Sequence, residues 1–335
     1  MSSVAATEAT TLTPRPVFLV NDALAQGPGQ STLWHNLVSW FSGEFIGGDF
    51  PGLGRVAAER LAGVTSGVCV RNASWFAPFD SPIPVVSLLQ DVLPEGHPGR
   101  PQQVEVCQRS QLIVANSKWT LAQYPELTGL PTKIIPLPVD FHAFRPREDA
   151  GALRAKWGVR ERSICWVGSG DVVKGYDILH RLIAQTSFNY VVVRKDKVNG
   201  PDWPDRWGGR CRNFGQLTQA DLAEIMASCV LGLCTSRSET QHLAGIEMMA
   251  CGLPVVAPAV GFYAGGDYQI PGYHHGGNIG YVAENMADIP KGIDKWMKTF
   301  NDPEYCGWVA SRPYAQKFCD PKICRTAWEE VVASV

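Results

Sequence analysis

The sequence predicts an α/β protein of two domains, each with a parallel sheet covered by helices. The chain has 335 residues, of which 45% are hydrophobic and 19% are charged, which is enough apolar material for two cores. In both halves, short apolar runs alternate with helix-like stretches, the pattern of buried parallel strands joined by helices. A charged stretch with two prolines at residues 138–149 separates the two series and predicts a linker.

The domain boundaries follow from composition. Residues 1–14 are rich in Ser, Thr and Ala and lack a charged start and an apolar core, so we expect a disordered tail rather than a signal peptide. We expect an N-terminal domain over residues 15–141 and a C-terminal domain over residues 142–310. Residues 311–335 should form a C-terminal helix that packs back on the N-terminal domain.

The expected elements can be placed in order. Apolar runs predict strands at residues 16–20, 68–70, 85–89, 112–115, 133–137, 163–167, 190–193, 230–236 and 255–257. Helical stretches are predicted at residues 32–41, 55–63, 104–111, 118–127, 176–184 and 218–228. Thr218 is the expected N-cap of the last of these helices. Residues 261–280 should form a long loop, and residues from about 282 onward should be helical with breaks.

Charge and cysteine usage exclude several classes of function. The net charge is −2, and neither half is basic, which argues against nucleic acid or an anionic membrane as partner. The 10 cysteines form no C-x-x-C motif, so we expect reduced thiols, no metal site and a cytoplasmic protein. The sequence lacks an apolar stretch of about 18 residues, so no transmembrane segment is expected.

Two glutamates stand out in the segment 236–258. Glu239 follows the apolar run 230–236, and Glu247 lies eight positions later, early in the next predicted helix. Carboxylates accept hydrogen bonds from sugar hydroxyls, and the start of a helix offers N–H groups to phosphate. Ligands of open parallel sheets bind at the carboxyl ends of the strands. The segment therefore predicts a sugar-nucleotide site, with two surface glutamates beside a buried helix as the alternative interpretation.

The pattern S-R-S-E-x7-E-M-M-A-C-G-L-P-V-V-A resembles the signature of the retaining GT-B glycosyltransferases of family 4, the group 1 glycosyltransferases. Residues 114–119, 135–146 and 167–175 are similar to other segments of that family. The resemblance implies two Rossmann-like domains that face each other across a cleft, with the acceptor on the N-terminal side. It also implies metal-independent transfer of a sugar from a nucleotide-sugar donor to a hydroxyl acceptor, with retention of configuration.

The resemblance also implies roles for individual residues. Catalytic roles fall to Lys174, which would neutralise the diphosphate, to Glu239, which would hold the transferred sugar, and to Gln90 and Asp91. Donor binding is expected at Gly27, Gly29, Gly168, Ser169, Lys174, Arg194, Asn213, Gly215, Glu239, Gln241, His242, Leu243, Ala244 and Glu247.

The chain departs from the family at several of these positions. Ser169 stands where the family has an arginine, and Arg194 or Lys195 could supply the missing cation. Thr240, Gln241 and His242 replace a Gly-Phe-Gly loop, and Gln90 replaces a histidine. A nucleotide-sugar epimerase, an inverting transferase of the same fold and a non-catalytic sugar- or nucleotide-binding module therefore stay open. The expected acceptor is soluble or a glycan, and the donor nucleotide and the oligomeric state are left undetermined.

Overall fold

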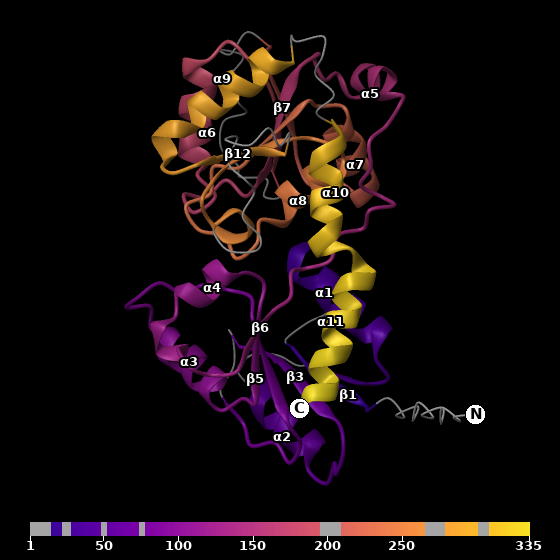
Figure 1. Ribbon diagram of the computed structural model, residues 1–335, viewed down its shortest axis with the longest axis vertical. Coiled ribbons are helices and arrows are strands. Elements are labelled where there is room, and N and C mark those ends of the chain that lie inside the picture. The colour runs from indigo at the N-terminus through magenta and orange to yellow at the C-terminus, as the bar shows by residue number, and fades with distance from the viewer. Residues whose placement is uncertain are drawn as a thin grey trace, which may run out of the picture.

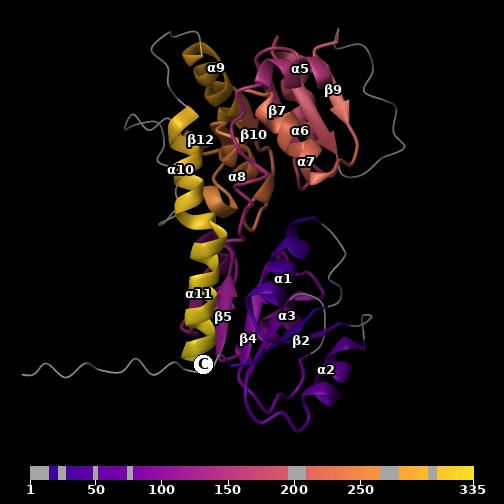
Figure 2. The ribbon, with the colours of Figure 1, turned by 90° about the vertical axis from the view of Figure 1, so that its right-hand side faces the viewer.

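The chain forms two parallel sheets with helices packed against them (Figures 1 and 2). The computed structural model describes residues 15–21, 28–47, 52–73, 78–194, 209–264, 279–300 and 308–335. Within these residues each sheet has six strands, and every neighbouring pair is parallel. The predicted α/β class is confirmed. The expected tail at 1–14 and Gly27 lie outside the described residues.

The first sheet defines the N-terminal domain and has the strand order β2-β1-β3-β4-β5-β6. Its strands are β1 (Val17–Val20), β2 (Gly43–Ile46), β3 (Val68–Asn72), β4 (Val85–Leu89), β5 (Leu112–Ala115) and β6 (Thr132–Ile134). Its helices are α1 (Pro28–Trp40), α2 (Leu53–Leu61), α3 (Arg100–Gln108), α4 (Lys118–Ala122) and the 3₁₀ helix η1 (Pro125–Leu127). Strand β2 was not predicted from the sequence, because this edge strand contains a glycine and a glutamate and forms no continuous apolar run.

The second sheet defines the C-terminal domain and has the order β12-β11-β10-β7-β8-β9. Its strands are β7 (Ser163–Gly168), β8 (Asn189–Arg194), β9 (Cys211–Phe214), β10 (Leu231–Leu233), β11 (Val255–Pro258) and β12 (Gly280–Ala283). Its helices are α5 (Ala150–Trp157), α6 (Tyr176–Gln185), α7 (Gln219–Ala227), α8 (Leu243–Ala250) and α9 (Ile289–Thr299), with the 3₁₀ helices η3 (Gly261–Tyr263) and η6 (Met286–Asp288). Thr218 caps α7 as predicted, since its hydroxyl accepts a hydrogen bond from Asp221 N. The short edge strand β12 was not predicted.

The C-terminal helices α10 (Trp308–Cys319) and α11 (Pro321–Ser334) span both domains (Figures 1 and 2). Ala315 and Cys319 of α10 belong to a hydrophobic cluster of the C-terminal domain. Trp328 and Val331 of α11 belong to the cluster that also contains β1, β3, β4 and β5 of the N-terminal domain. The helices meet at Asp320, whose side chain caps α11 by accepting from Lys322 N. The end of the chain therefore returns to the N-terminal domain.

The two domains contact each other through segments that follow strand ends. Thr120 in α4 donates its hydroxyl hydrogen to the carbonyl oxygen of Thr240 at 3.3 Å. Leu243, at the start of α8, packs against the hydrophobic cluster of the N-terminal domain. The carboxyl edges of the two sheets therefore lie near this contact, because in each sheet all strands run in the same direction.

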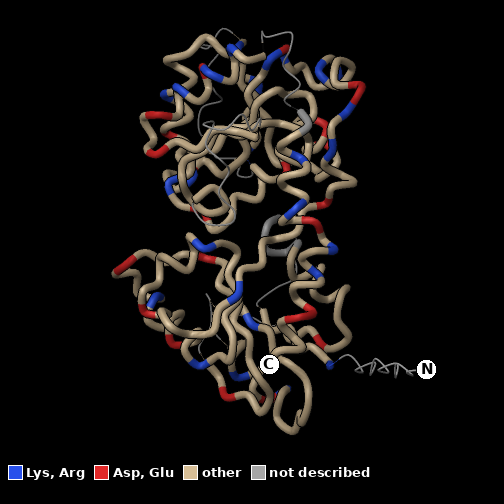
Figure 3. Tube along the Cα trace, in the orientation of Figure 1, with Lys and Arg blue, Asp and Glu red and all other residues tan. Residues whose placement is uncertain are grey.

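Acidic and basic residues are interspersed along the trace of both domains (Figure 3). This distribution matches the small net charge of −2. Among the helices in the described part of the chain, none combines the length and the apolar character needed to cross a membrane.

Candidate active site

Lys174 lies in the loop between β7 and α6, and the end of β10 fixes the shape of that loop. Gly175 has a φ of +66°, and a Cβ atom there would lie 1.9 Å from the carbonyl oxygen of Thr235. Only glycine fits such a close approach with a left-handed backbone. The hydroxyl of Thr235 donates to the carbonyl oxygen of Lys174 at 2.9 Å. The loop is therefore pressed against the segment that leads to Glu239.

Lys174 and Glu239 form an ion pair at the carboxyl edge of the sheet. Lys174 Nζ lies 2.7 Å from Glu239 Oε1, which also accepts from the hydroxyl of Ser236 at 2.7 Å. Glu239 is only 8% exposed. Burial by itself would raise the pKa of Glu239, but the charges of His242 and Lys174 and the hydrogen bonds from Lys174 and Ser236 outweigh it and lower that pKa. The sequence prediction named both residues, and the structure brings them into contact.

Arg237 was not among the predicted site residues, although it stands inside the S-R-S-E pattern. Its guanidinium donates to both carboxylate oxygens of Asp177 at 2.7 and 2.8 Å. Its backbone N–H donates to the carbonyl oxygen of Val173 at 2.8 Å. The hydrogen bonds from Arg237 lower the pKa of Asp177 to about 2. Arg237 thus joins the Lys174 loop to the Glu239 segment, and its position directly before Ser-Glu was the available signal.

Ser169 does not supply a cation to the site. Its hydroxyl donates to Asp171 Oδ2, and the other carboxylate oxygen of Asp171 accepts from Lys174 N at 2.8 Å. Ser169 and Asp171 therefore shape the loop that follows Gly168, the last residue of β7.

Arg194, Asn213 and Gly215 lie at the carboxyl ends of β8 and β9, beside the end of β7. The Arg194 guanidinium donates to the hydroxyl of Tyr176 at 2.9 Å and lies 5.3 Å from the centre of that ring. Both strand ends therefore share an edge with Lys174. Within the described residues, no hydrogen bond joins either Arg194 or Asn213 to Lys174 or Glu239.

The loop between the two glutamates forms contacts with neighbouring segments. His242 adopts a left-handed backbone with φ +67°, and its Nδ1 lies 2.9 Å from the hydroxyl of Tyr263. Burial lowers the pKa of His242 to about 4, so the ring is neutral at pH 7. Gly245 allows this packing, because a Cβ atom there would lie 1.8 Å from the Tyr263 oxygen. Leu243 and Ala244 form the first turn of α8 behind this cluster.

The structure places the Gln241 side chain against the interdomain linker. Its Oε1 accepts from Leu137 N at 2.5 Å, and its Nε2 donates to Leu137 O at 3.0 Å. Nε2 also contacts Cys319 Sγ at 3.7 Å. The amide is therefore fully engaged between the two domains, and its predicted direct contact with a donor has no support in this geometry. Gln241, which stands where the similar family has a phenylalanine, instead makes a contact between the domains.

Glu247 lies in the second turn of α8, within the helix predicted to carry it. Its side chain is partly buried, and within the described residues its carboxylate has no hydrogen-bond or ion-pair partner. Burial raises the pKa of Glu247 to about 8. The carboxyl group can therefore accept a ligand's hydroxyl hydrogens, but at pH 7 the free protein keeps it largely protonated.

One group of side chains in the described part of the chain has the composition of a metal site. Ligand atoms of Cys234, Glu239 and His242 lie within 4.8 Å of one another, and all three residues are buried. The Lys174 ammonium already binds the Glu239 carboxylate, and the Tyr263 hydroxyl lies beside His242 Nδ1. A metal ion would compete with this fixed positive charge for the same carboxylate.

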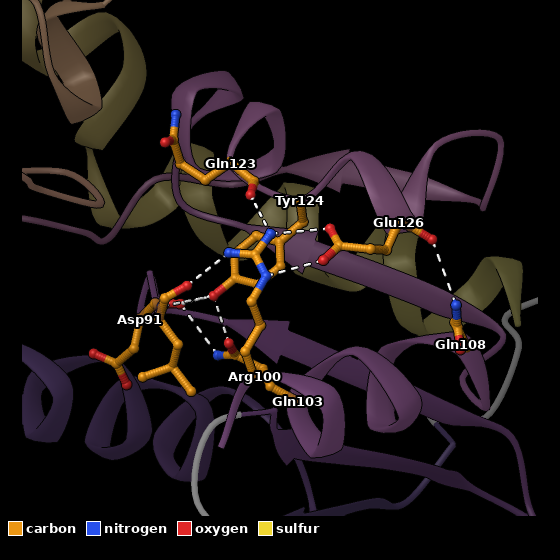
Figure 4. Close-up of polar contacts among 8 residues, drawn as sticks. Asp91, Arg100, Gln103, Gln108, Gln123, Tyr124 and Glu126 are labelled. Carbon is orange, nitrogen blue, oxygen red and sulfur yellow. Dashed lines mark hydrogen bonds and ion pairs between the residues drawn. The ribbon is translucent and has the colours of Figure 1, made fainter. Parts of the chain in front are cut away.

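Asp91 and its neighbours in the N-terminal domain belong to a polar network (Figure 4). The carbonyl oxygen of Asp91 accepts from the Tyr124 hydroxyl and from Gln103 Nε2, both at 3.2 Å. The same hydroxyl accepts from Leu93 N at 2.8 Å. Arg100 donates to Leu93 O at 2.7 Å. This network fixes the loop that begins with Gln90, directly after β4.

Arg100 is itself held on several sides (Figure 4). Its guanidinium forms two hydrogen bonds of 2.9 Å with the carboxylate of Glu126 and donates to Gln123 O at 2.5 Å. It also lies 4.3 Å from the centre of the Tyr124 ring. A bidentate pair of this kind defines direction as well as distance, so the loop after β4 is rigidly positioned.

The predicted glycines at the start of the chain are only partly described. Gly29 lies in the first turn of α1, and Gly27 is outside the described residues. Figures 1 and 2 both draw α1 on the side of the N-terminal domain that faces the C-terminal domain. Helix α1, which contains Gly29, therefore lies in the region where the domains face each other.

Comparison with known proteins finds a family match within the C-terminal domain. Residues 161–286 match the family model described as glycosyl transferases group 1. The resemblance predicted from the segment 236–258 is therefore confirmed for this part of the chain. The match covers both the Lys174 loop and the segment that carries Glu239 and Glu247.

Curated relatives match over part of their length. The D-inositol 3-phosphate glycosyltransferase of Kribbella flavida is 30% identical over 215 residues, which are 57% of this chain and 47% of that protein. The protein of the same name from Acidothermus cellulolyticus is 25% identical over 261 residues, 68% of this chain and 53% of the relative. The chain thus spans about half the length of the curated relatives it matches.

Solved structures share the fold over almost the whole chain. Anabaena HepE in complex with UDP-glucose has a TM-score of 0.73 and 18% identity, covering 96% of this chain and 100% of the other. WaaG, a glycosyltransferase involved in lipopolysaccharide biosynthesis, has a TM-score of 0.69 and 16% identity, again covering 96% and 100%. At these identities the likeness shows the fold, and it confirms the predicted two-domain GT-B architecture.

Proposed function

We propose that this protein is a glycosyltransferase that moves a sugar from a nucleoside-diphosphate sugar to a hydroxyl group of an acceptor, with retention of configuration. The observation that carries the proposal is the Lys174–Glu239 ion pair at 2.7 Å. It lies at the carboxyl edge of a parallel sheet, within the residues that match group 1 glycosyl transferases. In such sheets this edge is where ligands bind.

Each charged residue then has a defined task. Lys174 neutralises the diphosphate that leaves the sugar, and a compact ammonium suits that role. Because Lys174 provides this positive charge, we propose that the transfer does not require a metal ion. Glu239, held by Lys174 and Ser236, accepts hydrogen bonds from the hydroxyls of the transferred sugar. Glu247, which has no partner among the described residues, accepts those of the ribose.

Stabilisation of the leaving diphosphate and of an oxocarbenium-like sugar explains retention without a covalent intermediate. Glu239 is already bound on Oε1 by an ammonium and a hydroxyl, which makes it a weak nucleophile. The acceptor hydroxyl can approach on the side of the leaving diphosphate, whose oxygen then takes the acceptor proton. The remaining polar edge, at the ends of β4 and β5 in the N-terminal domain, is available to the acceptor.

The first donor to test is UDP-glucose, because HepE holds it in a structure of the same fold. We expect UDP and UDP-glucose to bind the wild-type protein, and we expect Lys174→Met to weaken both by at least tenfold. Transfer should continue in EDTA, and the product should keep the donor's anomeric configuration by NMR. A protein that binds neither ligand contradicts the proposal, and an inverted product contradicts retention.

The role of Glu247 has a separate readout. Ribose hydroxyls that donate to the carboxylate favour its ionised form, so UDP binding at pH 7 should release a proton from a group whose pKa is about 8. Calorimetry in two buffers of different ionisation enthalpy measures this release. Glu247→Gln should abolish it, and equal proton release from both proteins would show that Glu247 does not contact the ligand.

A further inference from the structure

Two carboxamides in the N-terminal domain are buried without a partner. Gln90 is 3% exposed and Asn116 is 1% exposed. In both side chains neither the oxygen nor the nitrogen has a hydrogen-bond partner within the described residues. Buried amides are nearly always hydrogen-bonded, because leaving one unsatisfied destabilises the folded state. Two such groups in one place indicate a site whose partner comes from a ligand.

The two amides lie side by side. Leu89, the last residue of β4, pairs with Ala115, the last residue of β5, so Gln90 and Asn116 follow neighbouring strand ends. Side chains alternate between the faces of a sheet. Leu88 and Val114, two positions earlier, both belong to the cluster beneath α11. Gln90 and Asn116 therefore continue one face at the carboxyl edge of the sheet.

The same edge is lined with further carboxamides. Asn21 follows β1 and Asn72 ends β3, and Asn72 Nδ2 donates to Asn21 Oδ1 at 3.4 Å. The buried Arg71 belongs to the opposite face, where its guanidinium lies 4.8 Å from the centre of the Phe79 ring. This face of the sheet's carboxyl edge therefore carries a row of uncharged carboxamides, each of which can both donate and accept hydrogen bonds.

We propose that Gln90 and Asn116 together bind neighbouring hydroxyl groups of an uncharged, sugar-like ring, an inference that rests on the proposed transferase function. Each hydroxyl donates one hydrogen bond and accepts others, and each amide does the same, so two hydroxyls satisfy both side chains. A phosphate group only accepts, and it would leave both amide oxygens unsatisfied. The amide pair therefore favours hydroxyl groups over a phosphate group at this position.

The pair is held where the two domains touch. The network of Arg100, Tyr124 and Gln103 fixes the loop that starts at Gln90 (Figure 4). Asn116 directly precedes the N-cap of α4, and α4 carries the hydrogen bond from Thr120 to Thr240 of the other domain. Because both amides are buried, binding of a ring at this site requires the surrounding segments to move apart.

The test combines stability with sugar recognition. Asn116→Leu and Gln90→Met remove the amides and nearly keep the side-chain volume. Asn189→Leu is the control, because Asn189 lies at the amino end of β8 in the C-terminal domain and its amide donates to Glu161 O. The probes are UDP, UDP-glucose, methyl α-D-glucopyranoside, myo-inositol and myo-inositol 1-phosphate. Calorimetry gives the affinities, a transfer assay gives KM, and thermal unfolding gives Tm.

We expect both amide variants to bind UDP within twofold of wild type and to have an equal or higher Tm, because no internal hydrogen bond is lost. A tenfold or larger loss of UDP-glucose affinity relative to UDP assigns the site to the donor sugar. A tenfold or larger rise in KM or dissociation constant for an uncharged ring, with the donor unaffected, assigns it to the acceptor. Asn189→Leu should change neither measure.

Several results would overturn the inference. Unchanged recognition of every sugar probe in both variants would do so, and so would a lower Tm in both, since that would show that the amides are bonded within the protein. A preference for myo-inositol 1-phosphate that Lys118→Ala abolishes would assign recognition to the exposed cation of α4. Absence of UDP binding by wild type contradicts the proposed function, whereas UDP binding with unaltered sugar recognition contradicts only the amide site.

Discussion

The carboxyl edges of the two sheets differ in whether their polar side chains are paired within the protein. In the C-terminal domain, Lys174 and Glu239 bind each other before any ligand is present. In the N-terminal domain, the amides of Gln90 and Asn116 are buried with no partner among the described residues. An unpaired buried charge is far more unfavourable than an unpaired buried amide. At the edge that carries Lys174 and Glu239, the charged edge, the protein itself pairs the charges. At the edge that carries Gln90 and Asn116, the neutral edge, the amides can stay unpaired until a ligand binds.

The largest effect is expected from the glycine that shapes the charged edge. Gly175→Ala places a Cβ atom 1.9 Å from the Thr235 carbonyl oxygen in a backbone with φ +66°. Either the Lys174 loop or the end of β10 must move, so we expect a loss of about 4 kcal/mol or more in the free energy of unfolding. Urea unfolding followed by circular dichroism measures it.

Gly129→Ala is the matched control for this effect. Gly129 has a φ of +85°, but a Cβ atom there meets nothing within 4 Å. Its substitution should cost only the backbone strain, about 1 kcal/mol. Equal losses from the two substitutions would show that the contact with Thr235 does not hold the loop in place.

The next effect comes from breaking the ion pair itself. Lys174→Met leaves the Glu239 carboxylate buried with only the Ser236 hydroxyl, so we expect a loss of about 2–4 kcal/mol at pH 7. The double variant Lys174→Met, Glu239→Gln should recover most of it, because no unpaired charge remains. Chemical unfolding of both variants checks this, and equal losses in the single and the double variant would contradict a stabilising pair.

The loss in Lys174→Met also has a predicted pH dependence. Burial works to raise the pKa of Glu239, but Lys174 and Ser236 lower it below 4.5 in the folded protein. The pair's contribution is therefore fully present above pH 4.5 and disappears as the pH falls through the folded pKa. The difference in unfolding free energy between wild type and variant should shrink below pH 4.5. A difference in unfolding free energy that does not change with pH would mean that the variant loses side-chain packing at position 174 and not an ion pair.

A smaller effect is expected at the contact between the domains. Gln241→Glu keeps an acceptor for Leu137 N but replaces the donor to Leu137 O with a second oxygen. We expect a loss of about 1–3 kcal/mol and a weaker coupling of the two domains, visible as a change in small-angle scattering. Gln241→Met, which makes neither hydrogen bond and introduces no charge, is the control and should lose less.

Sequence reasoning found the charged edge better than the neutral one, for a physical reason. Glu239 and Glu247 lie in one continuous strand–loop–helix segment, so their spacing along the chain reports their position in space. The amide row comes from the ends of separate strands, at positions 21, 72, 90 and 116, and becomes visible only when the sheet is assembled. The sequence indicates Asn116 only as a member of the family-like segment 114–119, and nothing in that segment predicts a buried side chain that lacks a hydrogen-bond partner.

The secondary structure also could be predicted only where the signal lies within one continuous segment of the chain. Long apolar runs such as β4 and β7 were predicted correctly, because burial on both faces requires them. The four-residue edge strands β2 and β12 were missed, because their strand conformation depends on pairing with β1 and β11 more than on their own residues. The contact between Gln241 and Leu137 was not predicted for a related reason, since the two residues are distant in sequence.

Glu247 is the exception among the charged residues of this edge, and it gives the prediction with the clearest pH direction. Burial without a partner raises its pKa to about 8, so the stability associated with its proton is fully present below the unfolded value of 4.5 and is lost as the pH rises through about 8. Glu247→Gln keeps the shape and cannot ionise. It should therefore be nearly as stable as wild type at pH 4.5 and more stable than wild type at pH 9, with a gap that widens as the pH rises between these values. Unfolding free energies across this range measure the effect. A gap that is independent of pH would mean that Glu247 has a partner after all, and that the charged edge is paired throughout.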